Sequence, residues 1–264
     1  MKKIAALFFI YIIFLQISCA ASSTKFMSIP DKQKNAENIF NEKVIQKTSS
    51  IHEKISQNEE TSLGTVILSD PNLNLQLCSS QITDLMYNNL FIQYRGQILP
   101  ISGSTLNNTM FNASLWPFDN NKKVAITLIS GEGSGVLLMD LHIIDLLSMT
   151  ELLYESPLSY LDSHLDSEMN DGIVSLTLPN QLFSFDIRGI DSDNLYEKAT
   201  YGGIIKYYVK DDTIFADIHI QISPTTNLGY VTLKYKFQEN KYTITQMDFF
   251  LYEDNQIPCQ ISQK

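Results

Sequence analysis

The sequence predicts an α+β fold that is predominantly antiparallel β-sheet, with a few helices packed on one face of the sheet. Three observations support this class. Successive segments near the C-terminus alternate apolar and polar residues with a period of two, which is typical of antiparallel strands with one solvated face. Two segments in the middle of the chain carry helix signals. Thirteen tyrosines and fourteen phenylalanines supply the apolar material for a packed core.

The chain begins with the three parts of a secretory signal peptide, predicted over residues 1–21. Lys2 and Lys3 form a short basic start, residues 4–17 are almost entirely apolar, and residues 18–21 are small. The apolar run of about 14 residues is shorter than the roughly 20 that a membrane-spanning helix needs. We therefore expect an exported chain with a cleaved signal; an uncleaved N-terminal anchor is the alternative.

The end of this segment, residues 15–19 (Leu-Gln-Ile-Ser-Cys), resembles the lipobox of bacterial lipoproteins. The resemblance implies that Cys19 is the lipidated first residue of the mature chain, which would attach the protein to a membrane. Its thiol would accept the diacylglyceryl group, and Ser18 is the small residue required before it. Gln16 departs from the pattern, which has Leu, Val or Ile at that position. Ordinary signal peptidase also accepts small residues such as these, so an unlipidated chain stays open.

A polar tether is predicted over residues 22–62, because this stretch is rich in Lys, Asn, Gln, Glu and Ser. A thin apolar stripe with helical spacing runs from Phe40 to Ile55 within it. We expect this segment to be partly helical or disordered. The remaining residues, 63–264, are predicted to form a single β-rich globular domain, since their number suits one large core.

The first part of the domain is predicted to be mainly strands separated by turns. A hairpin is expected about Arg95 and Gly96. Ser80 is a predicted helix N-cap, and apolar residues at intervals of three and four predict a helix over residues 82–90. The predicted strands span residues 65–69, 73–77, 91–94, 97–101, 110–115 and 124–130.

Two helices are predicted in the middle of the domain. Residues 137–154 are apolar nearly all round, which favours a mostly buried helix. Asp145, Ser148 and Glu151 recur at intervals of three and would lie on one face of it. A second, short helix is predicted over residues 157–166, with Ser156 as its N-cap and proline at its first position.

The C-terminal part carries the clearest strand pattern. Tight turns are predicted at residues 211–212 and 239–240. In the last strand the apolar phase shifts after Ile244, which predicts a bulge near Thr245 and Gln246. The alternating strands span residues 205–210, 214–222, 230–237 and 242–251, and two strands expected to join the same sheet span residues 173–178 and 182–187.

The net charge restricts the partners that the sequence predicts, and the cysteine content bears on its redox state. The formal net charge is −10 and the sequence contains no cluster of Arg and Lys, so a nucleic-acid partner is not expected. Once Cys19 is lipidated or removed, two cysteines remain. In an exported protein such a pair predicts a disulfide, here between Cys78 and Cys259. Two free thiols are the alternative.

The one glycine cluster, residues 131–135, does not match a cofactor motif. It lacks the spacing of a dinucleotide-binding loop, the lysine of a phosphate loop and the glycines that flank a nucleophile elbow. A turn between a strand and a helix is the favoured interpretation. No cofactor is predicted.

Two acidic segments are the candidates for a metal site. One is a turn at residues 191–194. The other combines four carboxylates with an imidazole: Asp162, His164, Asp166, Glu168 and Asp171. Neither segment has the ligand spacing of a calcium loop, and solvated ends of secondary structure commonly carry such residues. No metal site is predicted.

Catalytic residues cannot be assigned from motifs, and a binding role without catalysis is favoured over an enzyme, which stays open. His142 lies three residues before Asp145, which is a possible orienting contact for a general base, but no nucleophile is marked nearby. His219 is predicted to lie on a strand surface. Asn107 and Asn112 fit the glycosylation pattern, which matters only in a eukaryotic source.

Tyr208, Phe215 and Tyr230 are expected on the polar face of neighbouring strands. They would form a binding surface if exposed, but the predicted helices are expected to cover them. The sequence therefore predicts an exported, lipid-anchored bacterial envelope or surface protein that binds an unknown protein or small molecule. A secreted hydrolase with dispersed catalytic residues is the alternative.

Overall fold

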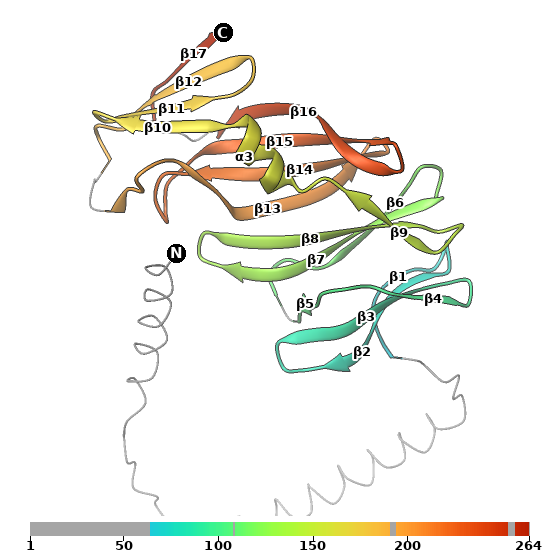
Figure 1. The fold of residues 1–264 in the computed structure, drawn as a ribbon. Coiled ribbons are helices and arrows are strands. Elements are labelled where there is room, and N and C mark those ends of the chain that lie inside the picture. Colours follow the sequence, from blue (N-terminus) through green and yellow to red (C-terminus); the bar gives the residue numbers. More distant parts are fainter. Residues whose placement is uncertain (1–63, 108, 191–193, 253–256, 264) are drawn as a thin grey trace, which may run out of the picture. The chain divides into compact units, whose positions relative to one another are not determined.

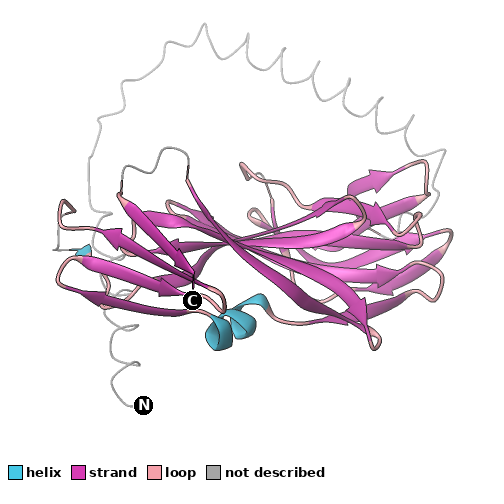
Figure 2. Ribbon diagram, turned by 90° about the horizontal axis from the view of Figure 1, so that it is seen from above, coloured by secondary structure: helices cyan, strands magenta, loops and turns pink. Residues whose placement is uncertain are grey.

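The computed structural model describes residues 64–107, 109–190, 194–252 and 257–263, which belong to one compact unit, Ser62–Lys264. These residues form three sheets, in which antiparallel pairing predominates (Figures 1 and 2). The predicted signal peptide, Cys19 and the tether lie outside the described residues. Within the described part of the chain, no helix has both the length and the apolar character needed to cross a membrane.

The first five strands form an N-terminal sheet. Its hydrogen-bonded order is β1-β2-β3-β4, and β5 pairs with β3. The predicted hairpin about Arg95 and Gly96 is confirmed, and both residues have the positive φ angles, 48° and 81°, that the tight turn requires. The strands are β1 (Thr65–Asp70), β2 (Leu75–Ile82), β3 (Met86–Tyr94), β4 (Gln97–Pro100) and β5 (Thr105–Leu106).

Eight strands form a central sheet in the order β13-β14-β15-β16-β9-β8-β7-β6. Two of its pairings are parallel, β16 with β9 and β13 with β8. Because β13, the first strand of this order, also pairs with β8, the strands from β13 to β8 form a closed ring of hydrogen-bonded neighbours, and β7 and β6 continue from β8. The strands are β6 (Ser114–Phe118), β7 (Lys123–Gly133), β8 (Val136–Asp145), β9 (Thr150–Tyr154), β13 (Thr200–Lys210), β14 (Thr213–Gln221), β15 (Asn227–Gln238) and β16 (Lys241–Leu251).

A C-terminal sheet of four strands has the order β10-β11-β12-β17. The prediction that residues 173–178 and 182–187 join the alternating strands is therefore wrong, because they pair with β10 and β17 in a sheet of their own. The strands are β10 (Asp166–Asn170), β11 (Ile173–Thr177), β12 (Gln181–Asp186) and β17 (Cys259–Gln263).

The described residues contain one α-helix, α3 (Pro157–His164), at the position predicted for the short helix. Ser156 is its N-cap: the backbone N–H of Ser159 donates to Ser156 Oγ at 3.4 Å. Proline occupies the start of the first turn, where its missing N–H has no intrahelical partner to lose. α3 buries Leu161 against the sheets.

Two hydrophobic cores lie between the sheets. The smaller core joins the N-terminal sheet to β7 and β8 through residues such as Leu77, Ile92 and Ile126, all 0 % exposed. The larger core joins the central sheet to the C-terminal sheet and α3. Figure 1 shows this arrangement, with β7 and β8 between the N-terminal sheet and the rest of the central sheet.

The predicted long helix over residues 137–154 is wrong, because this segment forms β8 and β9. β8 contributes to both cores: Leu141 and Ile143 face the larger core, while Ile144 faces the smaller one. A strand that is buried on both faces has an almost continuous apolar sequence, which period alone does not distinguish from a buried helix. Of the two helices expected over the sheet, the described residues therefore contain only the short one, α3.

The predicted helix over residues 82–90 is also wrong. Its residues end β2 and begin β3, joined by a turn in which the backbone N–H of Thr83 donates to the Met86 carbonyl. Leu85, at the turn, is 70 % exposed, so the apolar spacing there does not mark a buried stripe. The predicted strand over residues 110–115 lies later, at β6.

The predicted bulge is confirmed. Lys234 is opposite Gln246 and Tyr235 is opposite Ile244, so Thr245 is the extra residue on β16. The inserted residue explains why the apolar phase of this strand changes at that point.

The predicted disulfide between Cys78 and Cys259 is absent, and both residues are free cysteines. Cys78 lies on β2 of the N-terminal sheet, whereas Cys259 begins β17 of the C-terminal sheet. The hydrogen-bonded pairing of each strand within its own sheet thus assigns the two thiols to different sheets. Burial raises the pKa of both thiols, which keeps them protonated.

Candidate binding face

One face of strands β13 to β16 carries aromatic and polar side chains. The period of two places odd-numbered residues of β14 on this face and even-numbered residues in the larger core. Strand pairing sets Tyr208 beside Phe215, and His219 beside Tyr230. We call this surface the outer aromatic face, and define it by Lys206, Tyr208, Phe215, Asp217, His219, Tyr230, Thr232, Lys234, Gln246, Asp248, Phe250 and Tyr252.

At one end of the outer aromatic face, Tyr208 and Phe215 form a stacked pair with ring centroids 5.4 Å apart and an angle of 16° between the rings. Both side chains are half-buried. The Tyr208 hydroxyl donates to Asp217 Oδ1 at 3.4 Å. Burial and the neighbouring Asp217 charge raise the pKa of Tyr208 to about 12, so this hydroxyl keeps its proton at neutral pH.

Asp217 lies in the middle of the outer aromatic face. The Thr232 hydroxyl donates to its Oδ1 atom at 2.7 Å, from the residue directly opposite on β15. Burial raises the pKa of Asp217, whereas the hydrogen bonds from Thr232 and Tyr208 and the Lys206 charge act in the opposite direction. Asp217 is therefore a half-buried acceptor held in place by two hydroxyl groups.

An aromatic cluster occupies the other end. Tyr230 stacks on Phe250 with centroids 5.5 Å apart and 22° between the rings, and it lies 5.7 Å from the Tyr252 ring. His219 contacts Tyr230 and Tyr252 at centroid distances of 6.0 and 5.4 Å. Phe250 is 45 % exposed, so the cluster reaches the surface.

His219 and Tyr252 are joined by a hydrogen bond between the tyrosine hydroxyl and Nδ1. Burial lowers the pKa of His219, and the Lys206 charge adds to this effect, so the ring is neutral at neutral pH. Burial also raises the pKa of Tyr252 to about 12. The protonated hydroxyl therefore donates to Nδ1, which leaves the proton of the neutral ring on Nε2.

The helices expected to cover this face do not do so. Residues 137–154 form strands, and α3 buries Leu161 in the larger core, on the opposite side of the β14 backbone from Phe215. Tyr208, Phe215 and Tyr230 thus contribute to a surface of half-buried and exposed side chains. The sequence allows these aromatic residues to form either an accessible surface or a surface covered by helices, and the structure supports the accessible surface.

The candidate catalytic histidines are in other places. His142 is buried, and its Nδ1 lies 2.6 Å from Glu151 Oε1, not near Asp145. The Asp145 carboxylate instead accepts from the backbone N–H groups of Leu147 and Ser148 at 2.9 and 3.0 Å. His142 and Glu151 therefore form a pair that links β8 to β9.

His164 stacks on Tyr160 with centroids 3.9 Å apart, and its Nδ1 lies 2.8 Å from the Tyr160 carbonyl oxygen and 2.9 Å from Ser163 Oγ. Asp162 accepts a hydrogen bond from the Tyr201 hydroxyl at 2.6 Å. Among the described residues, no three His, Cys, Asp or Glu side chains are arranged to hold a metal ion, and this applies to the acidic segment with Asp162, His164, Asp166, Glu168 and Asp171 as well.

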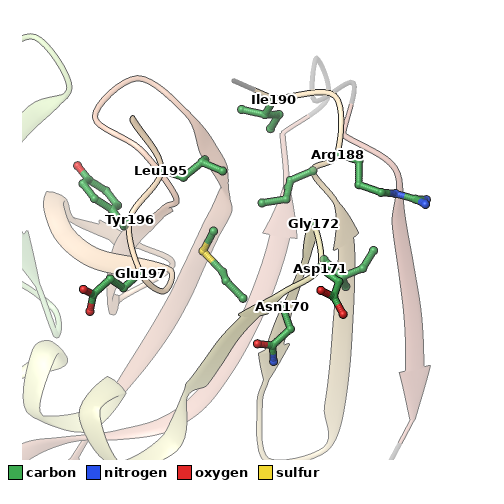
Figure 3. A pocket seen from close by; sticks show the side chains of 11 residues that line it. Asn170, Asp171, Gly172, Arg188, Ile190, Leu195, Tyr196 and Glu197 are labelled. Carbon is green, nitrogen blue, oxygen red and sulfur yellow. The ribbon is translucent and has the colours of Figure 1, made fainter. Parts of the chain in front are cut away.

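Two of the open cavities that lie away from the outer aromatic face border residues named from the sequence. One, of about 470 Å³, is bordered by Asp162, His164 and Asp166. The other, of about 520 Å³, lies at one end of the C-terminal sheet (Figure 3). Arg188 lines it, but this side chain extends away from Leu195 in Figure 3 and pairs with Asp186.

The remaining residues named from the sequence do not join a site. Residues 131–135 form the end of the β7–β8 hairpin, where Gly135 has a positive φ angle of 72°. The acidic turn at residues 191–194 lies mostly outside the described residues, and Asn112 is exposed before β6. Sequence reasoning missed Asp217, Phe250 and Tyr252; the alternating pattern gave the orientation of each, but not their contact with side chains on other strands.

No family model, curated protein or solved structure matches this chain.

Proposed function

We propose that the chain is an exported, lipid-anchored envelope or surface protein of a bacterium, and that it acts by binding a ligand on the outer aromatic face. The N-terminal sequence supports export and lipidation at Cys19. The observation that carries the binding role is the cluster of Tyr230, Phe250, Tyr252 and His219 at the surface.

Such a cluster is suited to recognition. Aromatic side chains offer large contact areas with little conformational entropy to lose, and they are enriched where proteins bind partners. Grouped exposed aromatics mark binding surfaces more often than isolated ones do. The neighbouring Asp217, Thr232 and Lys206 add directional polar groups, as binding sites commonly require.

The alternative, a secreted hydrolase, would use the cavity beside His164. Ser163 Oγ is within hydrogen-bond distance of His164 Nδ1 there. However, Nδ1 also faces the Tyr160 carbonyl oxygen, which is an acceptor, so this nitrogen carries a proton and is not free to remove one from Ser163. Binding on the outer aromatic face is therefore the better supported proposal.

The binding role is tested by measuring the association of the full chain, purified in mild detergent, with envelope material from the cells that produce it. We expect Phe250→Ala to weaken this association at least about tenfold, which corresponds to 1.4 kcal/mol of lost contact. Phe237→Ala is the matched control, because Phe237 is similarly exposed, at 39 %, but lies at the far end of β15, where its ring contacts Tyr242 at an angle of 49°. Equal affinities for both variants and the wild type would refute the proposal.

The anchoring part of the proposal has a separate test. Mass spectrometry of the mature N-terminus is expected to show a diacylglyceryl group on Cys19 in chain isolated from the membrane fraction. A Cys19→Ala variant should be released from that fraction. A mature chain that begins after Cys19, or an intact leader on chain inside the cell, would contradict lipid anchoring.

A further inference from the structure

We infer that the ligand of the outer aromatic face is a neutral glycan chain, a sugar polymer that lies across strands β13 to β16. This inference rests on the proposed binding function and names the class of its ligand. Its basis is the arrangement of side chains on this face. Two aromatic ring pairs lie at its ends, and polar side chains that can hydrogen-bond to hydroxyl groups lie between them.

The two stacked ring pairs define the ends of the surface. Tyr208–Phe215 and Tyr230–Phe250 each stack through one face of each ring, and Phe250, which is exposed, presents the most accessible of these rings to a ligand. Phe215 and His219 are four residues apart on β14, so the two aromatic ends are separated by about 13 Å. A sugar ring presents C–H groups on its faces, and these are attracted to the electron-rich face of an aromatic ring.

Polar side chains occupy the space between the ring pairs. Thr232 and Tyr208 both donate to Asp217 Oδ1, and no described residue is hydrogen-bonded to Oδ2. Oδ2 can therefore accept from a ligand hydroxyl, while Lys206 and Lys234 supply donors on the flanking strands. Hydroxyl groups at the edge of a sugar ring fit this mixture of acceptors and donors.

A protein partner fits the same surface less well. A tight protein interface would remove water from Asp217, Asp248 and Lys206, and interface centres are depleted in such charges because their desolvation is unfavourable. A glycan instead keeps the surface hydrated and supplies hydroxyl groups to the charged side chains.

The charges of the outer aromatic face also disfavour an anionic ligand. Lys206 and Lys234 balance Asp217 and Asp248, and the whole chain has a net charge of −10. Phosphate-rich polymers and anionic lipid headgroups would gain no net electrostatic attraction here. An uncharged polyhydroxylated ligand does not need one.

The test uses the full chain in mild detergent and three portions of envelope from the producing cells: intact, protease-digested, and protease-digested with lipids extracted by organic solvent. The last portion is the glycan probe. We expect the wild type to bind all three with similar affinity, and Asp217→Asn to bind each at least about tenfold more weakly, because the variant loses a charge-assisted hydrogen bond. Asp84→Asn, an exposed aspartate in the β2–β3 turn, is the control and should bind like the wild type.

The outcomes separate this inference from the proposed function. Binding that is lost on proteolysis indicates a protein partner, and binding that is lost on solvent extraction indicates a lipid surface. Either result overturns the glycan inference while the binding role stands. If the wild type does not bind the intact envelope, both the glycan inference and the proposed binding function are refuted. If Asp217→Asn binds the glycan portion like the wild type, the polar centre assigned here is wrong.

Discussion

The two faces of strand β14 differ in almost every property although they share one backbone. Ile214, Ala216, Ile218 and Ile220 face the larger core and are at most 1 % exposed. Phe215, Asp217 and His219 face outward, are half-buried, and contact side chains of the neighbouring strands. Residues that stabilise the fold and residues of the candidate site therefore alternate along this strand, so one set can be substituted without changing the other.

Two consecutive phenylalanines on β16 show the same division. Phe249 packs on Phe183 and Phe185 of the C-terminal sheet, with ring centroids 4.8 and 6.0 Å apart. Phe250 points the other way, is 45 % exposed and stacks on Tyr230. One residue type therefore holds two sheets together at one position and forms a binding surface at the next.

The largest expected effect comes from breaking the alternation itself. Deletion of Thr232, in the middle of β15, shifts half of the strand by one residue and turns its core side chains toward solvent. Because native stability is only about 5–15 kcal/mol, we expect loss of cooperative folding. Near-ultraviolet circular dichroism and urea unfolding of the purified chain measure this.

Deletion of Thr245 is the matched control, and its expected effect is small. Thr245 is the extra residue of the bulge, so its removal makes Ile244 and Gln246 consecutive and keeps them opposite Tyr235 and Lys234. Both faces stay in phase, and we expect a loss below about 2 kcal/mol. If the two deletions destabilise the chain equally, the bulge assignment is wrong.

A smaller effect is expected from truncation within one face. Ile218→Ala removes a side chain that is 0 % exposed in the larger core, and such changes typically cost about 2–5 kcal/mol. Phe215→Ala, three residues earlier on the outer side, removes a half-buried ring and should cost less. Urea unfolding of both variants measures the difference in their free energies of unfolding. If Phe215→Ala lowers this free energy more than Ile218→Ala does, the outer aromatic face contributes more to the stability of the fold than the larger core at this strand.

The same comparison explains how much could be predicted from the sequence. The alternating strands, their turns, the bulge at Thr245 and the capped helix α3 are specified by local patterns, and the structure confirms them. The pattern of β8 predicts a helix because sheets on both sides bury this strand, and that burial depends on strands far away in the sequence. Local period contains no information about such distant partners.

The candidate site was predictable in part for the same reason. Tyr208, Phe215 and Tyr230 follow from alternation within single strands. Asp217 gains its role from Thr232 on β15 and Tyr208 on β13, contacts that only strand pairing creates. The outer aromatic face is accessible because residues 137–154 form strands and not the predicted helix. The local pattern of these residues therefore gave the wrong expectation for this surface as well.

The smallest expected effect concerns the charge of Asp217. Burial raises the pKa of Asp217, so folding stabilises its protonated form relative to the unfolded chain. The resulting stabilisation is fully present below the unfolded pKa of about 3.9 and is lost as pH rises through the higher folded pKa. Asp217→Asn cannot lose a proton there. Its unfolding free energy should therefore increase relative to the wild type between pH 3 and pH 7, as measured by urea unfolding at both pH values.

Asp186 provides a control of opposite sign. Hydrogen bonds from Arg188 lower the pKa of Asp186 to about 2, so its ionised form is stabilising above the unfolded pKa and that stabilisation is lost as pH falls through about 2. Asp186→Asn should therefore become less stable relative to the wild type between pH 3 and pH 7, whereas Asp217→Asn becomes more stable. Since both variants exchange one carboxylate for an amide, a shared direction would mean that the change in net charge, and not local burial, sets the response. In that case Asp217 would be as solvated as an ordinary surface carboxylate, and the difference between the half-buried centre of the outer aromatic face and its surroundings would disappear.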